Sequence, residues 1–235
     1  MNIRVVLALM AVLGSFAGAA AQTPVPMDPS LGVDGKPLPG TSIPCAPIAE
    51  KRQELGCYVI GRPRLVLPAG PVSWHLDVYP NRASAEAAKG PLGVVAEAFE
   101  RTWLLTIAAP GWHAIGDAKH VATVGPLPLD PTRAAEYTAF YIATTFQPGL
   151  SSFVHQHPGP EAWFIVTGEQ CLETPDGALP GHAGEGFVVR GDLPMIVYAT
   201  GTEIRRNFAL VLHDATKATT SQVDHWKPKG LCHRS

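Results

Sequence analysis

The residues best suited to chemistry lie in one short stretch of the chain. His155 and His157 are one residue apart, and Glu161 follows after the turn-forming residues 158–160, Pro-Gly-Pro. In an extended strand His155 and His157 point to the same side, and the turn can bring Glu161 back to face them. Two imidazoles and a carboxylate form the facial triad of non-haem Fe(II) sites. The spacing therefore predicts a divalent metal site.

The elements around these residues are predicted to be short strands separated by turns. The chain has 23 glycines and 23 prolines, and residues 175–177, Pro-Asp-Gly, are a strong hairpin signal. We expect strands at residues 57–60, 64–67, 72–79, 94–99, 102–107, 137–146, 151–157, 161–167, 168–174, 187–190, 195–199 and 205–213. One short helix is expected at 82–89, with Asn81 as N-cap and Gly90 as its stop. This pattern favours an all-β sandwich or barrel.

The spacing of the framing glycines resembles a known family. Gly149-x5-His155-x-His157-x3-Glu161-x6-Gly168 matches the first signature motif of the cupin family at every fixed position. This resemblance covers roughly residues 120–214. It implies an all-β cupin jelly-roll barrel in which the motif side chains hold a divalent metal (Fe, Mn, Ni or Zn).

The second cupin motif is degraded in this chain. Gly184 is present, but Arg190, Asp192 and Met195 stand where proline, glycine and the fourth, metal-binding histidine are expected. His182 and His213 are alternative sources of that ligand. The alternative to a metal site is a barrel that has kept the first motif as packing and lost its metal.

Further side chains are predicted to line the barrel cavity. Trp163 and Ile165 have the same strand parity as Glu161 and should lie beside the metal. The other candidate pocket residues are Met195, Tyr141, Arg190 and His213. Polar groups at Arg190 and Asp192 would hold an anionic substrate or pair with each other.

Histidines elsewhere are interpreted as solvent-exposed. His75 and Asp77 alternate with Trp74 and Leu76, which predicts an outward-facing polar pair. His113 and His120 fall in expected loops, and His225 and His233 in the tail.

Composition excludes several classes of function. The net charge is −2, only 16% of the residues are charged, and no Lys/Arg run occurs, which argues against nucleic acid or an anionic membrane as partner. A Gly-x-Ser-x-Gly elbow and glycine-rich phosphate loops are also absent from the sequence.

The N-terminus predicts export. Residues 1–21 have a positive start at Arg4, an apolar stretch and an Ala-Ala-Ala cleavage site, as in a secretory signal peptide. We then expect a Pro-rich arm at 22–55, a strand-helix-strand extension at 56–119, the barrel at 120–214 and a tail at 215–235. The product should be secreted or periplasmic, without a membrane span once the signal is cleaved.

Four cysteines suit an oxidising compartment. Cys45, Cys57, Cys171 and Cys232 allow three disulfide pairings. We favour Cys57 with Cys232, which would join the N-terminal part to the tail. Free, buried thiols are the alternative.

Three functions are compatible with these features. The leading one is a metal-dependent enzyme acting on a small organic molecule, with a lean to a dioxygenase because a three-ligand site has open positions; catalytic residues beyond the metal ligands are not assigned. The second is a non-catalytic module that binds a small ligand. The third is a cell-envelope interaction protein that uses residues 22–48. The family resemblance also implies a homodimer.

Overall fold

The computed structural model describes residues 45–51 and 54–233. The predicted signal peptide and the arm as far as residue 44 lie outside the described residues. Short 3-10 helices occur near both ends of the described chain, at η1 (Ile48–Glu50) and η2 (Leu231–His233). Within the described ranges, no helix is both long and apolar enough to span a membrane.

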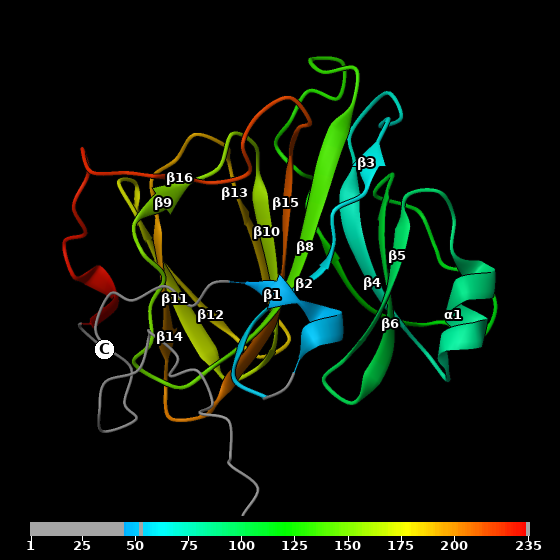
Figure 1. The fold of residues 1–235 in the computed structure, drawn as a ribbon, viewed down its shortest axis with the longest axis horizontal. Coiled ribbons are helices and arrows are strands. Elements are labelled where there is room, and N and C mark those ends of the chain that lie inside the picture. Colours follow the sequence, from blue (N-terminus) through cyan, green and yellow to red (C-terminus); the bar gives the residue numbers. More distant parts are fainter. Residues whose placement is uncertain (1–44, 52–53, 234–235) are drawn as a thin grey trace, which may run out of the picture.

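The largest sheet runs through the middle of the molecule (Figure 1). Its main path has the order β1-β2-β8-β15-β10-β13, and β3 also pairs with β8. These strands are β1 (Ala46–Pro47), β2 (Gly56–Gly61), β3 (Arg64–Leu65), β8 (Tyr137–Phe146), β10 (Glu161–Thr167), β13 (Gly186–Val189) and β15 (Arg205–Asp214).

Two smaller sheets lie over one face of the large sheet and complete a barrel (Figure 1). One contains β12 (Gly177–His182), β11 (Glu169–Thr174) and β14 (Ile196–Thr200) in that order, and the other pairs β9 (His155–Gln156) with β16 (Ser221–Gln222). A cavity lies between them and the large sheet, since its lining includes residues of β8, β9, β10, β14 and β15.

A four-stranded sheet packs on the other face of the large sheet. Its order is β5-β6-β4-β7, from β4 (Ser73–Tyr79), β5 (Gly93–Ala98), β6 (Arg101–Ala108) and β7 (Lys119–Val124). Trp74, Leu76 and Trp103 from this sheet form one apolar cluster with Phe164 and Phe208 of the large sheet. The helix α1 (Arg82–Ala88) covers the outer side of this sheet (Figure 1).

Strand β8 separates these two environments by its alternation. Phe140 and Ile142 line the cavity, whereas Ala139, Tyr141 and Ala143 belong to the cluster shared with the four-stranded sheet. The strand therefore has two distinct apolar faces. Because successive side chains point to opposite faces, one strand serves the barrel and the second core together.

The predicted fold class, an all-β barrel with a strand and helix extension, is confirmed. The helix begins after Asn81, whose side chain accepts a hydrogen bond from the Ser84 amide at 2.9 Å, as an N-cap should. Four strands were not predicted: β7, β12 and the two-residue strands β1 and β16. The extension also differs in form, because β2 and β3 join the barrel sheet whereas β4 to β6 form a separate sheet with β7. The domain boundary at residue 120 stays a prediction.

The prediction that His75 and Asp77 face solvent is wrong. Both side chains are buried, at 0% and 1% exposure. The outer face of β4 is covered by the chain after β6, where His75 Nε2 donates to the Ala109 carbonyl at 3.0 Å and Tyr79 donates to that of Ile115 at 2.7 Å. His120, expected in a loop, lies in β7 and contacts Asp77 at 2.9 Å.

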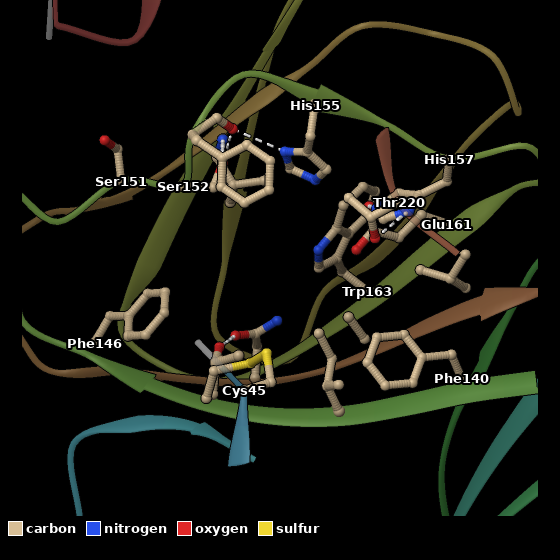
Figure 2. Close-up of a pocket in the computed structure, with 18 of the residues that line it drawn as sticks. Cys45, Phe140, Phe146, Ser151, Ser152, His155, His157, Glu161, Trp163 and Thr220 are labelled. Carbon is tan, nitrogen blue, oxygen red and sulfur yellow. Dashed lines mark hydrogen bonds and ion pairs between the residues drawn. A yellow bond between two sulfur atoms is a disulfide. The ribbon is translucent and has the colours of Figure 1, made fainter. Parts of the chain in front are cut away.

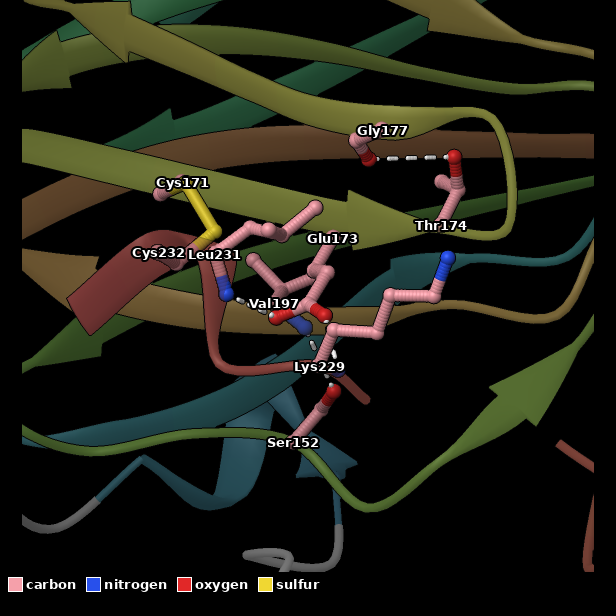
Figure 3. Close-up of a disulfide and its surroundings, with 9 residues drawn as sticks. All are labelled: Ser152, Cys171, Glu173, Thr174, Gly177, Val197, Lys229, Leu231 and Cys232. Carbon is pink, nitrogen blue, oxygen red and sulfur yellow. Dashed lines mark hydrogen bonds between the residues drawn. A yellow bond between two sulfur atoms is a disulfide. The ribbon is translucent and has the colours of Figure 1, made fainter. Parts of the chain in front are cut away.

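The favoured disulfide pairing is also wrong. The structure joins Cys45 to Cys57 and Cys171 to Cys232, and no cysteine is free in the described chain. Cys57 and Cys232 lie in different parts of the molecule: β2 is in the large sheet, whereas η2 packs on β11 (Figure 3). The alternative of free, buried thiols is also wrong, because all four cysteines form disulfides.

Candidate functional site

The three predicted metal ligands meet at one end of the barrel. His155 lies in β9, where its amide and carbonyl both pair with those of Met195. His157 follows directly, and the 158–160 turn returns the chain so that Glu161 begins β10. The three side chains are buried, and their ligand atoms all lie within 4.8 Å of one another. Figure 2 shows them grouped above the cavity.

Hydrogen bonds determine which ring nitrogens face the site. His155 Nδ1 donates to the Phe153 carbonyl at 2.8 Å, and His157 Nδ1 donates to that of Thr219 at 2.7 Å. A carbonyl oxygen only accepts, so each ring carries its proton on Nδ1 in the neutral form. The Nε2 lone pair of each ring is then available to a metal, as in sites where a carbonyl orients the ligand histidine.

The carboxylate of Glu161 strengthens the case for a cation. Its Oε2 is buried without a conventional hydrogen bond, 3.1 Å from His157 Nε2. With the His157 proton on Nδ1, two lone pairs face each other at this distance. Either a proton or a metal ion must lie between them, because such electron-rich groups repel in a low dielectric. The donor set and its orientation therefore fit a divalent metal.

The two histidines differ electrostatically. Burial lowers the pKa of His155 below its ordinary value, and the attraction of Glu161 does not compensate. Burial opposes the charged form of His157 as well, but the nearby charge of Glu161 and the hydrogen bond to the Thr219 carbonyl outweigh it and raise the pKa. When His157 is protonated, its Nε2–H faces the Glu161 carboxylate, so metal binding there would release that proton.

The site opens onto a cavity of about 320 Å³. Its walls are largely apolar between the metal-site residues and the Cys45–Cys57 disulfide, both visible in Figure 2. The lining consists of Cys45, Cys57, Arg62, Phe140, Ile142, Thr144, Phe146, Ser151, Ser152, Phe153, His155, His157, Glu161, Trp163, Val197, Arg205, Asn207, Ala209, Val211 and Thr220. A cavity of this size suits a small organic molecule.

Of the other predicted pocket residues, Trp163 lines the cavity and Tyr141 does not. Trp163 lies two residues after Glu161 on the same face of β10. Ile165, predicted beside it, is buried but is not part of the lining. The prediction that Tyr141 lines the pocket is wrong. This side chain lies on the opposite face of β8 and packs on Trp74, with ring centroids 6.3 Å apart. Parity along β8 decides this, because Phe140 and Ile142 occupy the cavity side.

The residues of the degraded second motif lie around the barrel rather than in the cavity. Met195 is buried in an apolar cluster that includes Trp163, and its backbone exchanges two hydrogen bonds with that of His155. The prediction that Arg190 belongs to the pocket is wrong, because its side chain is exposed. It pairs with Asp176 at 3.6 Å rather than with Asp192. The Asp192 amide donates to the His157 carbonyl at 2.7 Å, which helps to hold the ligand loop.

Neither alternative fourth ligand joins the three-residue cluster. His213 is buried, but its Nδ1 donates to the Asp214 carbonyl at 2.8 Å and its Nε2 accepts from Thr219 at 3.1 Å. It therefore supports the residue whose carbonyl holds His157. His182 is exposed and lies 3.8 Å from Glu169.

Sequence reasoning missed the polar residues deeper in the cavity. Arg205, Asn207 and Thr144 all line it and are buried. Asn207 accepts a hydrogen bond from Thr144, and Arg205 donates to Thr144 at 2.9 Å. The available signal was parity, since Arg205 and Asn207 lie four and two residues from inward-facing Ala209 and so share its face of β15.

Comparison with known proteins gives matches among solved structures alone. Neither a family model nor a curated protein matches the chain. A cupin superfamily protein from Desulfitobacterium hafniense is 16% identical, with a TM-score of 0.31 over 32% of this chain and 68% of its own. A cupin 2 conserved barrel domain protein from Salinispora arenicola is 27% identical, with a TM-score of 0.30 over 37% and 70%. A DMSP lyase from Ruegeria pomeroyi is 17% identical, with a TM-score of 0.32 over 36% and 43%.

Two of these structural neighbours carry the name of the family that the first motif resembles. Likenesses of this strength say nothing about activity. The chemistry of the site must be argued from its own residues.

Proposed function

We propose that the barrel binds one divalent metal ion through Nε2 of His155, Nε2 of His157 and the carboxylate of Glu161, and that the protein is an enzyme acting on a small organic molecule in the cavity. The observation that carries this proposal is the commitment of both Nδ1–H groups to carbonyl oxygens. It directs two neutral nitrogen donors toward a buried carboxylate oxygen that has no conventional hydrogen bond.

The number of protein ligands favours catalysis over a purely structural metal. Structural sites are usually closed by four protein ligands, whereas catalytic sites keep positions open for substrate or water. Here three donors come from one side, and the cavity lies beside them. Bound metal would supply Lewis-acid or redox chemistry. Among redox reactions, dioxygenation is the one that a facial two-histidine, one-carboxylate site suits best.

The protein's own groups would bind and orient the substrate. Trp163, Phe140 and Ile142 offer apolar contact along the cavity and exclude water. His157 and Glu161 would both hold the metal, and any proton between them would have to leave before it binds. Thr220 Oγ1, 3.3 Å from His157 Nδ1, and the Thr219 carbonyl keep the ring from rotating.

We also infer that the protein works in an oxidising compartment after export. Both pairs of cysteines form disulfides, and such bonds persist outside the cytoplasm. The signal peptide and the homodimer stay predictions.

Metal analysis of the natively folded protein tests the proposal. The protein is purified without chelator or nickel resin, beside a His155→Ala/His157→Ala variant and a His113→Ala/His182→Ala control that removes two exposed histidines. We expect about one metal ion per chain by mass spectrometry in the wild type and the control, and none in the first variant. Near-ultraviolet circular dichroism checks that all three are folded.

The contrary result is equally informative. If folded wild-type protein contains no metal and takes up none on titration with Fe(II), Mn(II), Ni(II) or Zn(II), the enzyme proposal fails. A small-ligand-binding module with a vestigial site would then be the better interpretation, particularly since Met195 stands where a fourth ligand is expected.

A further inference from the structure

A guanidinium group is buried in the cavity away from the metal-site residues. Arg205 is 2% exposed, begins β15 and lines the same cavity as Glu161. Its Nη1 donates to Gln170 Oε1 at 3.1 Å and its Nη2 to Thr144 Oγ1 at 2.9 Å. Its Cζ lies 4.7 Å from the centre of the Phe146 ring. These partners are neutral, so they accept hydrogen bonds from the guanidinium of Arg205 without balancing its positive charge.

Arg205 has an incomplete set of partners. Its Nε is buried with no hydrogen-bond acceptor among the described residues, and no ion pair joins its guanidinium to a carboxylate there. Taking a cation out of water costs several kcal/mol unless an opposite charge repays it. Burial lowers the pKa of Arg205 to about 9, with Glu161 acting in the opposite direction, so the side chain is still a cation at neutral pH.

The cavity as a whole has an excess of positive charge. Among the residues that the structure describes, its lining contains two arginines, Arg62 and Arg205, and one carboxylate, Glu161. Arg62 is exposed, with its guanidinium 4.2 Å from the centre of the Phe140 ring, whereas Arg205 is enclosed. A divalent metal on Glu161 would neutralise the one negative group and leave Arg205 without an opposing charge. Arg205 would then have no anionic partner among the described side chains that line the cavity.

The strand register places the two charged centres at different levels. On β15, Val211 pairs with Glu161 and Ala209 with Trp163, and the same face continues to Asn207 and Arg205. The guanidinium of Arg205 reaches back to Thr144, which pairs with Asn207 in the register, so it points toward the metal end. Apolar side chains at the levels of Trp163 and Ile142 separate the charged groups.

We propose that the cavity binds a small organic acid whose carboxylate lies against Arg205 and whose apolar part lies beside Trp163, pointing toward the metal-site residues. The inference rests on the proposed function for the reacting end of the molecule and names its substrate class. A carboxylate would accept from the guanidinium, whose planar fork matches it in geometry and charge. A neutral analogue of the same shape would leave the buried cation unpaired.

Matched acids and amides test this assignment. Calorimetric titration compares acetate, hexanoate, benzoate and 3-phenylpropanoate with their primary amides at pH 7.5, on the full chain as purified. For at least one pair, we expect the acid to bind at least tenfold more tightly than the amide. Arg205→Gln, which keeps hydrogen bonding and removes the charge, should abolish that preference, and Arg205→Lys should keep part of it.

Two variants serve as controls. Arg206→Gln removes the neighbouring charge on the opposite face of β15, where Arg206 pairs with Glu54, and should leave the acid preference unchanged. Arg62→Gln removes the exposed arginine of the lining. Equal binding of acid and amide in every wild-type pair overturns the proposal, as does a preference lost in Arg62→Gln but kept in Arg205→Gln.

Failure of this inference is distinguishable from failure of the proposed function. The metal content of Arg205→Gln should equal that of the wild type, because Arg205 contacts none of the three metal-site side chains. An acid preference that survives in Arg205→Gln but disappears in His155→Ala/His157→Ala assigns the carboxylate to the metal and overturns the role of Arg205. If Arg205→Gln does not fold, the wild type and Arg205→Lys still decide. Acids and amides that bind with equal affinity in both proteins reject the proposed site.

Discussion

One buried histidine outside the candidate metal site, His75, belongs to a second polar cluster. In the neutral ring, His75 Nε2 donates to the Ala109 carbonyl at 3.0 Å and Nδ1 accepts from Thr123 Oγ1 at 3.1 Å. Thr123 also contacts His120, whose Nδ1 faces Asp77. This arrangement needs a neutral His75. The ring is enclosed by the residues after β6, with Trp112 edge-on at 5.2 Å.

Acid should destabilise the fold through His75. Burial lowers its pKa below the ordinary 6.5, although the Ala109 carbonyl and Asp77 oppose the shift and His120 adds to it. The unfolded chain therefore binds a proton that the native state refuses, and stability falls as the pH drops through about 6.5. We expect urea unfolding between pH 7.5 and 5.5 to show a smaller loss for His75→Gln than for the wild type.

The comparison needs an exposed histidine as reference. His113→Gln, in the segment between β6 and β7, should keep the full wild-type pH dependence. His213, whose pKa burial also lowers, remains in all three proteins and accounts for part of the residual slope. Parallel slopes for wild type and His75→Gln would refute the assignment.

At the scale of elements, the ligand loop is held by close backbone approach. A Cβ on Gly159 would lie 2.1 Å from the Leu212 carbonyl oxygen and 2.9 Å from the His213 Cα. The Cβ position of Gly191 is equally restricted, 2.7 Å from the Gly159 Cα. The turn between His157 and Glu161 is thus pressed between the end of β15 and the segment after β13.

Gly159→Ala should loosen the metal site without touching a ligand. The new methyl group must displace backbone, because the atoms that it meets belong to the main chain, and overpacking typically costs about 1–3 kcal/mol. We expect lower stability and at least tenfold weaker metal binding by competition with a chromophoric chelator.

Gly111→Ala is the matched control, since no atom lies within 4 Å of the added Cβ and its φ is not positive. It should bind metal as the wild type does. Wild-type metal affinity in Gly159→Ala would show that the turn does not position His157 and Glu161.

At the scale of the molecule, the C-terminal segment is tied to the barrel that it helps to complete. Cys232 is bonded to Cys171 of β11, and the carboxylate of buried Glu173 accepts from the amides of Lys229 and Leu231 (Figure 3). Upstream, this segment forms β16 and supplies the Thr219 carbonyl to His157. The same segment is therefore anchored to β11 at Cys232 and orients His157 through the Thr219 carbonyl.

Removing this disulfide should affect stability more than removing the other. The Cys171–Cys232 bond closes 61 residues and the Cys45–Cys57 bond 12, for which chain entropy predicts about 4 and about 3 kcal/mol. We expect Cys171→Ala/Cys232→Ala to show the larger loss in urea unfolding and weaker metal binding. Equal metal affinity in both double variants would show that the Cys171–Cys232 disulfide does not help to position the metal-site residues.

Local rules were sufficient to predict much of this protein. The alternation of β8, the Asn81 cap and the hairpin at 175–177 follow from side-chain parity and backbone preferences that neighbouring residues determine. The convergence of His155, His157 and Glu161 was predictable for the same reason, because a strand and a tight turn connect them.

Other features depended on which sheet covers which face, and short-range sequence patterns contain no such information. His75 and Asp77 alternate like an exposed pair but are covered by the segment after β6, and Arg190 pairs with Asp176 across the β12 edge. The cysteine pairings join segments whose proximity only the packed barrel establishes. Arg205 becomes a cavity residue in the same way: the sequence determined its strand face, and the tertiary structure decided that this face lines the cavity that the candidate metal ligands also line.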